Sequence, residues 1–330
     1  MKTRILGTGS FLPPGVVTNN DLGRMMDTSD EWIVQRTGIR ERRWVEGATT
    51  TTDLALEAAR RALESADVAA GELDMIIFAT LSPDHEFPGA GCFLQAKLGV
   101  SGIPALDVRQ QCTGFLHGLS IADHFIRAGT YKKILLVGAE IHSKGLDKTT
   151  RGREISVLFG DGAGAVVLGA HEGREGILTT HLHADGRFAR ELWVKAPTQA
   201  VSGERINAEM LAAGEHYPQM NGRMVFVNAV KKMPEALKEA LDAAGATVND
   251  VDLFVLHQAN TRISEMVCSQ LQIPREKFFS TIEKYGNTTA ATIPIGLDEA
   301  VRSGRIKPGM LVATAAFGSG FTWASALVRW

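Results

Sequence analysis

A cysteine, a histidine and an asparagine stand where predicted strands or turns pass into helices. Residues 105–118 read ALDVRQQCTGFLHG, with Cys112 at their centre. Apolar residues between 103 and 108 predict a short buried strand, and the apolar run 115–126 has helical spacing. Because the unpaired N–H groups and the dipole at a helix start stabilise a thiolate, Cys112 is a candidate nucleophile. The alternative is a buried cysteine that packs as a small apolar side chain.

His257 and Asn287 occupy comparable positions later in the chain. His257 follows a strand predicted over 252–256 and precedes Gln258, Ala259 and Asn260. Asn287 heads the segment 285–297, YGNTTAATIPIGL, which reads as a turn followed by a helix. With Cys112, these two residues form a candidate constellation for nucleophilic catalysis.

The chain repeats its own pattern of elements. Residues 54–79 and 233–257 both read as an amphipathic helix, a glycine-containing turn and a strand. A second pair, 127–137 (RAGTYKKILLV) and 302–312 (RSGRIKPGMLV), recurs in the same order at nearly the same spacing. We predict two duplicated α/β halves, 1–172 with the nucleophile and 173–330 with His257 and Asn287. A shared site would then lie at the junction of the halves.

Composition narrows the class of protein. The chain has 330 residues, of which 45% are hydrophobic and 22% are charged, and its net charge of −2 argues against nucleic acid as the main partner. No apolar run reaches the roughly 20 residues of a membrane span, and residues 1–15 lack the apolar core of a signal peptide, so we expect a cytoplasmic protein. The three cysteines and nine histidines have the spacing of neither a disulfide framework nor a metal site.

Three glycine-rich stretches have different expected uses. Gly7 and Gly9 are followed by Pro13-Pro14, where a dinucleotide-binding fold needs a helix. Residues 159–169, FGDGAGAVVLG, run into a β-branched segment, which favours close backbone packing over a phosphate site. Residues 317–320, FGSG, follow a predicted strand and either aim a backbone N–H at an oxyanion or form a plain turn into the last strand.

Several long motifs give the sequence a family resemblance. They are ILGTGSFLPP near the start, TSDEWIVQRTGIRERR at 28–43, FGDGAGAVVLG, HLHADG, HQAN, GNTTAA and the final FGSGFTWASALVRW. On these motifs the chain resembles the bacterial β-ketoacyl-acyl-carrier-protein synthase III family of the thiolase superfamily, over essentially its whole length. The resemblance implies a five-layer αβαβα fold of two duplicated halves, a homodimer, and catalysis without a metal or redox cofactor.

The resemblance also implies a chemistry. Cys112 matches the nucleophile that takes an acyl group from a coenzyme A thioester, and backbone N–H groups of Cys112 and Ser319 would hold the oxyanion. His257 and Asn287 match the pair that promotes decarboxylation of malonyl-acyl-carrier protein. The resulting carbanion attacks the acyl-cysteine and yields a 3-oxoacyl thioester, the step that initiates fatty acid synthesis. A non-enzymatic scaffold is disfavoured because all three chemical residues are present.

Binding residues follow from the same resemblance. Trp32 and Arg151 match residues that hold the adenine of coenzyme A, Arg36 matches one beside its phosphates, and Asn260 matches a position that fixes a loop or a water. The bulky ring at Phe87 matches a position that reaches across the dimer. With Phe317 it predicts an acyl pocket for short to medium chains.

The sequence departs from the family pattern in four places. Gln110 and Gln111 replace two small residues before the nucleophile, and Ser319 replaces the middle glycine of a GGG turn, where a positive φ would strain it. Arg262 is the sole basic residue of the helix predicted after HQAN, which predicts weak docking of an acidic carrier protein. Residues 195–220 form a longer segment, either a lid over the acyl pocket or a surface elaboration.

These departures leave a second enzyme class open. The weak docking helix fits a specialised relative of secondary metabolism that uses malonyl-coenzyme A or another acceptor. A third class, relatives that condense two long chains, carries a glutamate base near Phe87, whereas this chain has Glu86 one position away.

Overall fold

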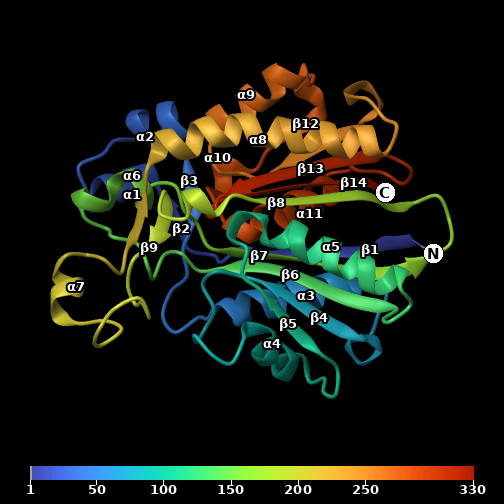
Figure 1. The fold of residues 1–330 in the computed structure, drawn as a ribbon, viewed down its shortest axis with the longest axis horizontal. Coiled ribbons are helices and arrows are strands. Elements are labelled where there is room, and N and C mark those ends of the chain that lie inside the picture. Colours follow the sequence, from blue (N-terminus) through green and yellow to red (C-terminus); the bar gives the residue numbers. More distant parts are fainter. Residues whose placement is uncertain (1) are drawn as a thin grey trace.

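The structure, a computed structural model, describes residues 2–330 as five stacked layers of helices and sheets (Figure 1). Two five-stranded sheets lie parallel to each other, with one pair of helices between them and further helices on both outer faces. The predicted αβαβα arrangement is therefore confirmed. Both ends of the described chain lie on the same side of the molecule (Figure 1).

The first sheet is built from the first half of the sequence. Its strands are, in spatial order, β1 (Lys2–Phe11), β7 (Gly162–His171), β6 (Lys133–Glu140), β4 (Met75–Ala79) and β5 (Ala105–Val108). Its outer face is covered by α3 (Thr51–Ala66) and α4 (Ala90–Leu98), and its inner face by α5 (Gly114–Arg127). The buried face of α3 is rich in alanine, which lets its backbone approach β1 at Gly7 and Gly9 closely.

The second sheet repeats this design. Its strands are β8 (Gly176–Ala184), β14 (Thr322–Arg329), β13 (Leu311–Gly318), β11 (Leu253–Leu256) and β12 (Phe278–Phe279). The outer helices are α8 (Gly222–Ala243) and α9 (Thr261–Leu271), and the inner one is α11 (Thr292–Arg302). In both sheets the first two strand pairs are antiparallel and the last two are parallel. The internal duplication read from the sequence therefore has a direct counterpart in topology.

Smaller elements decorate one end of this core. They are the pairs β2 (Val16–Thr18) with β3 (Glu41–Arg43) and β9 (Leu192–Val194) with β10 (Pro218–Met220), and the helices α1 (Asn19–Gly23), α2 (Asp30–Thr37), α6 (Arg153–Ser156), α7 (Ala208–Ala212) and α10 (Ile282–Tyr285). The predicted boundary at residue 172 lies in the turn between β7 and β8, and we keep that division of the chain as a proposal.

The two halves share one core. Apolar residues of α5, α11 and both sheets form a single buried cluster. Thr8 and Ser10 of β1 donate hydrogen bonds to the buried carboxylate of Asp298 on α11, at 2.8 and 2.6 Å. A Cβ at Gly164 of β7 would lie 2.7 Å from the backbone nitrogen of Ile295, so this glycine permits the close approach of β7 to α11. The glycine-rich stretch 159–169 is thus used for packing, as predicted.

The strand before Cys112 is not buried as predicted. β5 is the outer strand of its sheet and pairs only with β4 among residues 2–330. Its middle residues Leu106 and Asp107 are exposed, since no element covers them on the open side. Apolar composition alone cannot separate a central strand from an edge strand.

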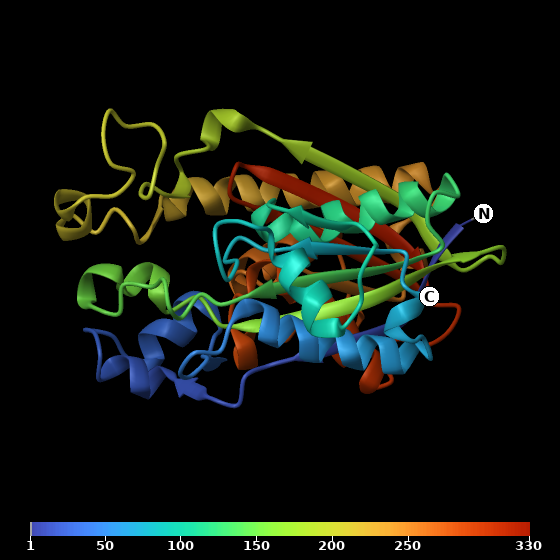
Figure 2. The same cartoon turned by 90° about the horizontal axis from the view of Figure 1, so that it is seen from below.

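The segment 195–217 forms an arm that extends away from the sheets (Figures 1 and 2). Arg205 of the arm contacts both carboxylate oxygens of Glu86, at 2.5 and 2.6 Å. Of the predicted segment 195–220, Met220 at its end lines the central cavity beside Leu192, and residues 195–219 do not. This placement favours a surface elaboration over a lid. In residues 2–330, no helix is long and apolar enough to cross a membrane.

Candidate active site

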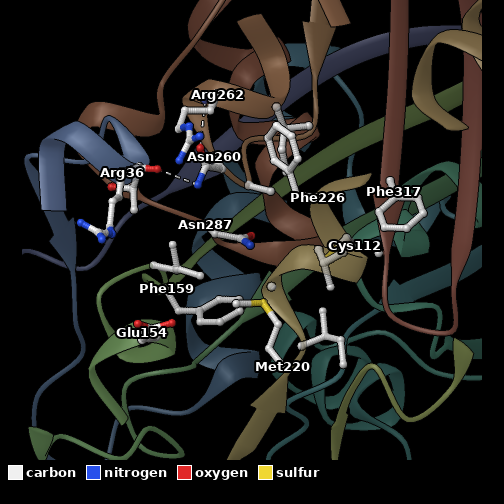
Figure 3. A pocket seen from close by; sticks show the side chains of 18 of the residues that line it. Arg36, Cys112, Glu154, Phe159, Met220, Phe226, Asn260, Arg262, Asn287 and Phe317 are labelled. Carbon is white, nitrogen blue, oxygen red and sulfur yellow. Dashed lines mark hydrogen bonds between the residues drawn. The ribbon is translucent and has the colours of Figure 1, made fainter. Parts of the chain in front are cut away.

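One cavity of about 370 Å³ opens at the end of the molecule where α2, α8 and α9 meet. Cys112, His257 and Asn287 all line it, together with Phe159 and Phe317. Figure 3 shows Cys112, Asn287 and the two phenylalanine rings around this space. Cys112 comes from the first half, and His257 and Asn287 come from the second half. The sequence-predicted constellation is therefore brought together in one space.

Cys112 lies in a short 3₁₀ turn, Gln111–Thr113, between β5 and α5. The turn needs Gln111 at a φ of 45°, and the thiol is buried ahead of the first turn of α5. Burial, and then the nearby carboxylate of Glu140, raises the pKa of the thiol to about 12. The expected thiolate is therefore wrong for the resting protein, because desolvation outweighs the helix start and the hydrogen bonds from the backbone N–H groups of Cys112 and Ser319.

Replacing Glu140 by glutamine should make Cys112 more reactive. Burial raises the pKa of Glu140 to about 7, so its carboxyl is ionised and opposes the thiolate only above neutral pH. We expect iodoacetamide to alkylate Glu140→Gln faster than the parent protein, by about tenfold for each unit of pKa lost, with a gap that widens from pH 6 to 9. Glu154→Gln is the control, since Glu154 lines the cavity but does not raise the pKa of Cys112. Superimposable alkylation profiles would contradict the role of Glu140.

His257 follows β11 and is held through its Nδ1 atom. Nδ1 lies 2.7 Å from Oγ1 of Thr292, whose hydroxyl donates to the carbonyl of Thr289 at 3.0 Å. In this arrangement the hydroxyl oxygen accepts from Nδ1–H and Nε2 is bare; a hydroxyl that turns to donate to Nδ1 gives up Thr289, and Nε2 then carries the proton. Burial lowers the pKa of His257 to about 3, so the imidazole is neutral. Its Nε2 is buried and has no hydrogen-bond partner among residues 2–330, which leaves this atom for a ligand.

Asn287 is fixed by the turn that follows it. The backbone N–H of Thr289 donates to Oδ1 of Asn287 at 2.8 Å, which leaves the NH₂ group for the cavity. Its backbone pairs with that of residues 158–160, beside Phe159. The sequence analysis missed the support that Thr289 and Thr292 give. The hydroxyls spaced three residues apart in GNTTAAT were the available signal.

The turn after β13 closes the cavity against Cys112. A Cβ at Gly318 would lie 2.7 Å from Cβ of Cys112, so a glycine is required there. The positive φ of this turn, 135°, belongs to Gly320, so the expected strain at Ser319 is absent from the described turn. Instead, the hydroxyl of Ser319 donates to the backbone carbonyl of Leu192 in β9. The backbone N–H groups of Cys112 and Ser319 both lower the pKa of the Cys112 thiol, so both lie close to the sulfur.

The mouth of the cavity carries an aromatic ring with two arginines. The Arg36 guanidinium lies 4.4 Å and that of Arg153 5.1 Å from the centre of the Trp32 ring. Arg151 is placed elsewhere: its Nε donates to Asp147 at 2.6 Å, and its guanidinium lies 5.6 Å from the Tyr217 ring. Arg153 was not among the residues predicted from the sequence, although RGR at 151–153 offers either arginine.

The remaining predicted residues have mixed placements. Asn260 caps α9 and donates to the backbone carbonyl of Arg36 at 3.0 Å, so it joins two walls of the mouth (Figure 3). Arg262 lies on the rim, 5.7 Å from the ring of Phe226. Phe87 is 82% exposed and lies outside the cavity of its own chain. Gln110 and Gln111 are half-buried rather than buried.

No cluster of three or more His, Cys, Asp or Glu side chains within residues 2–330 has the geometry of a metal site.

Comparison with known proteins gives a consistent result. Residues 106–186 match the family described as 3-oxoacyl-[acyl-carrier-protein] synthase III, and residues 241–330 match its C-terminal part. The β-ketoacyl-[acyl-carrier-protein] synthase III of Xanthomonas axonopodis pv. citri is 47% identical over 99% of this chain and 98% of that protein. The corresponding protein of Alkalilimnicola ehrlichii is 48% identical, over 99% of each.

Solved structures agree with these relatives. The 3-oxoacyl-[acyl-carrier-protein] synthase III of Aquifex aeolicus superposes with a TM-score of 0.91 at 43% identity, covering 99% of this chain and 100% of that one. Another, from Thermus thermophilus, gives a TM-score of 0.92 at 40% identity and covers 99% of each chain. The chain therefore belongs to the 3-oxoacyl-[acyl-carrier-protein] synthase III family.

Proposed function

We propose that this protein condenses an acyl-coenzyme A with malonyl-acyl-carrier protein, releasing carbon dioxide and forming a 3-oxoacyl-acyl-carrier protein that starts fatty acid synthesis. The observation that carries the proposal is the convergence of Cys112, His257 and Asn287 on one cavity. The names of relatives that align over the full length support the same reaction.

In the first half-reaction, Cys112 is acylated. Its thiol is protonated at rest, so it must lose a proton to attack, and Nε2 of His257 is the unpartnered base in the same cavity. The sulfur attacks the thioester carbonyl, and the oxyanion is held by the backbone N–H groups of Cys112 and Ser319. The C–S bond of the thioester breaks, and the coenzyme A thiolate takes the proton from His257.

In the second half-reaction, a malonyl thioester enters the cavity. Nε2–H of neutral His257 and the NH₂ group of Asn287 donate hydrogen bonds to its thioester oxygen, which stabilises the enolate formed as carbon dioxide leaves. The enolate carbon bonds to the acyl carbon and expels the Cys112 thiolate. That thiolate takes a proton from water, because a carboxylate has left as neutral carbon dioxide and the overall reaction consumes one proton.

The Ser319→Gly variant should weaken both half-reactions to a similar, modest degree. Without the hydroxyl, the oxyanion turn loses its tie to Leu192, although its N–H groups remain. We expect rates of acylation and of condensation about three- to tenfold lower, the cost of about 1 kcal/mol for one lost hydrogen bond. Ser319→Ala should behave alike, and Ser303→Gly on the surface should not. A change confined to one half-reaction would contradict this account.

For coenzyme A, the proposed binding site is the mouth of the cavity. The Trp32 ring offers a stacking surface for adenine, and Arg36 and Arg153 offer positive charge for phosphates. We retain Arg151 as a proposed adenine contact that would have to leave Asp147 and turn towards Trp32. Acyl groups would occupy the apolar end beside Phe317 and Phe159.

A homodimer is part of the proposal. The open edge of β5 presents unpaired backbone groups, which a second copy can cover by strand pairing. Phe87 lies beyond this sheet and is exposed in the single chain, as a residue that closes the partner's acyl pocket would be. A cytoplasmic location stays a prediction.

The second candidate is a specialised ketosynthase that uses malonyl-coenzyme A or another non-carrier acceptor. Its support is the rim helix α9, which carries Arg262 and Glu265 and exposes Met266. A priming β-ketosynthase of the R1128 polyketide pathway is also similar, at 32% identity, 99% and 96% coverage and a TM-score of 0.91.

The deciding experiment follows both half-reactions. Acyl-coenzyme A donors of increasing chain length are incubated with the protein, and its intact mass is recorded before and after addition of malonyl-acyl-carrier protein or malonyl-coenzyme A. An acyl adduct that is discharged only by malonyl-acyl-carrier protein supports the main proposal. Equal discharge by malonyl-acyl-carrier protein and by malonyl-coenzyme A supports the specialised enzyme. A protein that forms no adduct with any donor excludes both.

A further inference from the structure

The geometry points to His142 as a positioning residue that fixes Asn287 for decarboxylation by holding Thr289. This inference rests on the proposed function of the cavity. His142 comes from the first half of the chain and is outside the group of residues that line the cavity. Its contact with Asn287 is indirect and passes through one turn of the second half.

His142 is itself held firmly. It follows the end of β6, where its backbone N–H and that of Ser143 donate to Oδ1 of the buried Asp161, at 2.7 and 2.9 Å. Its ring lies 4.5 Å from that of Phe159, which lines the cavity. Its Nε2 lies 2.7 Å from Oγ1 of Thr289. Burial lowers the pKa of His142 to about 3, so this contact joins two neutral groups at any pH at which the enzyme works.

Thr289 needs such a restraint because of its backbone. Its φ is 51°, in the left-handed region that a β-branched residue rarely adopts. A residue in this conformation persists only when its surroundings impose it. The hydrogen bond between His142 and the Thr289 hydroxyl, together with the packing of the buried turn, supplies that constraint.

One catalytic side chain depends on this turn. The backbone N–H of Thr289 donates to Oδ1 of Asn287 at 2.8 Å and so orients its carboxamide. If the turn relaxed, the amide would lose this anchor. His257 is held through Nδ1 by Thr292, and Cys112 and the turn at Ser319 share none of these hydrogen bonds, so acylation should be spared.

The test separates the two half-reactions in His142→Phe, which keeps a ring against Phe159 but removes the hydrogen bond. Cys112 acylation by acetyl-coenzyme A is followed by intact mass, and carbon dioxide release from malonyl-acyl-carrier protein by the preformed acyl-enzyme is followed separately. We expect carbon dioxide release to fall about 10- to 100-fold, and acylation to stay within about twofold. His142→Gln, whose amide can reach Thr289, should recover most of the loss.

Thr289→Val and Thr289→Ser form the matched pair on the other side of the contact. The valine variant keeps the shape and lacks the hydroxyl, so it should reproduce His142→Phe, and the serine variant should stay near the parent protein. The double variant His142→Phe, Thr289→Val should be no worse than either single one. If His142→Phe does not fold, the Thr289 pair decides.

An equal loss in both half-reactions, or undiminished carbon dioxide release, would overturn the role of His142. A parent protein that forms no acyl-enzyme would instead overturn the proposed function itself.

Discussion

The Cys112→Ala variant will form no covalent adduct with any acyl-coenzyme A, and its condensation rate will fall on the order of 10⁴-fold or more. The reason is that the acyl group has no other acceptor in the cavity: Cys112 is the only cysteine among the described residues that line it. Intact mass after incubation with acetyl-coenzyme A measures the adduct, and product formation measures the rate.

Cys268→Ala is the matched control for this variant. Cys268 is also partly buried with a raised pKa, about 11, but it lies on α9 outside the cavity. Cys268 should be acylated neither in the parent protein nor in Cys112→Ala. The Cys268→Ala variant should condense at the rate of the parent protein. Persistent acylation of Cys112→Ala would disprove the assigned nucleophile.

Alkylation of Cys112 in the parent protein should accelerate with pH. A thiol whose pKa is raised to about 12 is almost wholly protonated at neutral pH, so the thiolate fraction grows about tenfold per pH unit up to that value. Alkylation of the free enzyme by iodoacetamide reports this fraction directly. A plateau already reached near pH 7 would show that a stable thiolate exists after all.

The Asn287→Asp variant should lose decarboxylation while it keeps acylation. A carboxylate has the shape of the amide but only accepts hydrogen bonds. Its negative charge would repel both the enolate oxygen and the malonyl carboxylate. We expect carbon dioxide release to drop about 10²- to 10³-fold, the usual cost of one lost oxyanion donor. Cys112 should still be acylated at a rate close to that of the parent protein.

Asn249→Asp provides the control for the charge change, because Asn249 is exposed on the 3₁₀ turn Val248–Asp250, away from the cavity. His257→Ala should resemble Asn287→Asp in the second half-reaction, and it should also slow acylation, since His257 is the proposed proton acceptor. Full decarboxylation by Asn287→Asp would remove Asn287 from the mechanism.

Much of this site was predictable from sequence because its parts are local. Cys112, His257 and Asn287 each sit in a short motif at the end of a strand or the start of a helix, and the repeat placed these ends at one junction. The same repeat predicted the paired sheets. These features depend on residue order alone, and the three side chains line one cavity of the structure.

What the sequence did not reveal depends on contacts between distant segments. The exposure of β5 depends on which strand lies beside it, and the pKa of Cys112 depends on its burial and on Glu140 at the end of another strand. The Ser319 hydroxyl finds its partner in β9, far away in the sequence. None of these pairs is visible in local spacing.

The hydrogen bonds from Thr8 and Ser10 to Asp298 have a wider consequence for how the protein denatures. They connect the first strand of the chain to a helix near its end, within a core that both halves form together. If one half unfolded, the buried side chains of the other half would lose the layer that covers them. Loss of native structure should accordingly be cooperative, with no surviving single-half intermediate, and catalysis should vanish together with the last folded molecules.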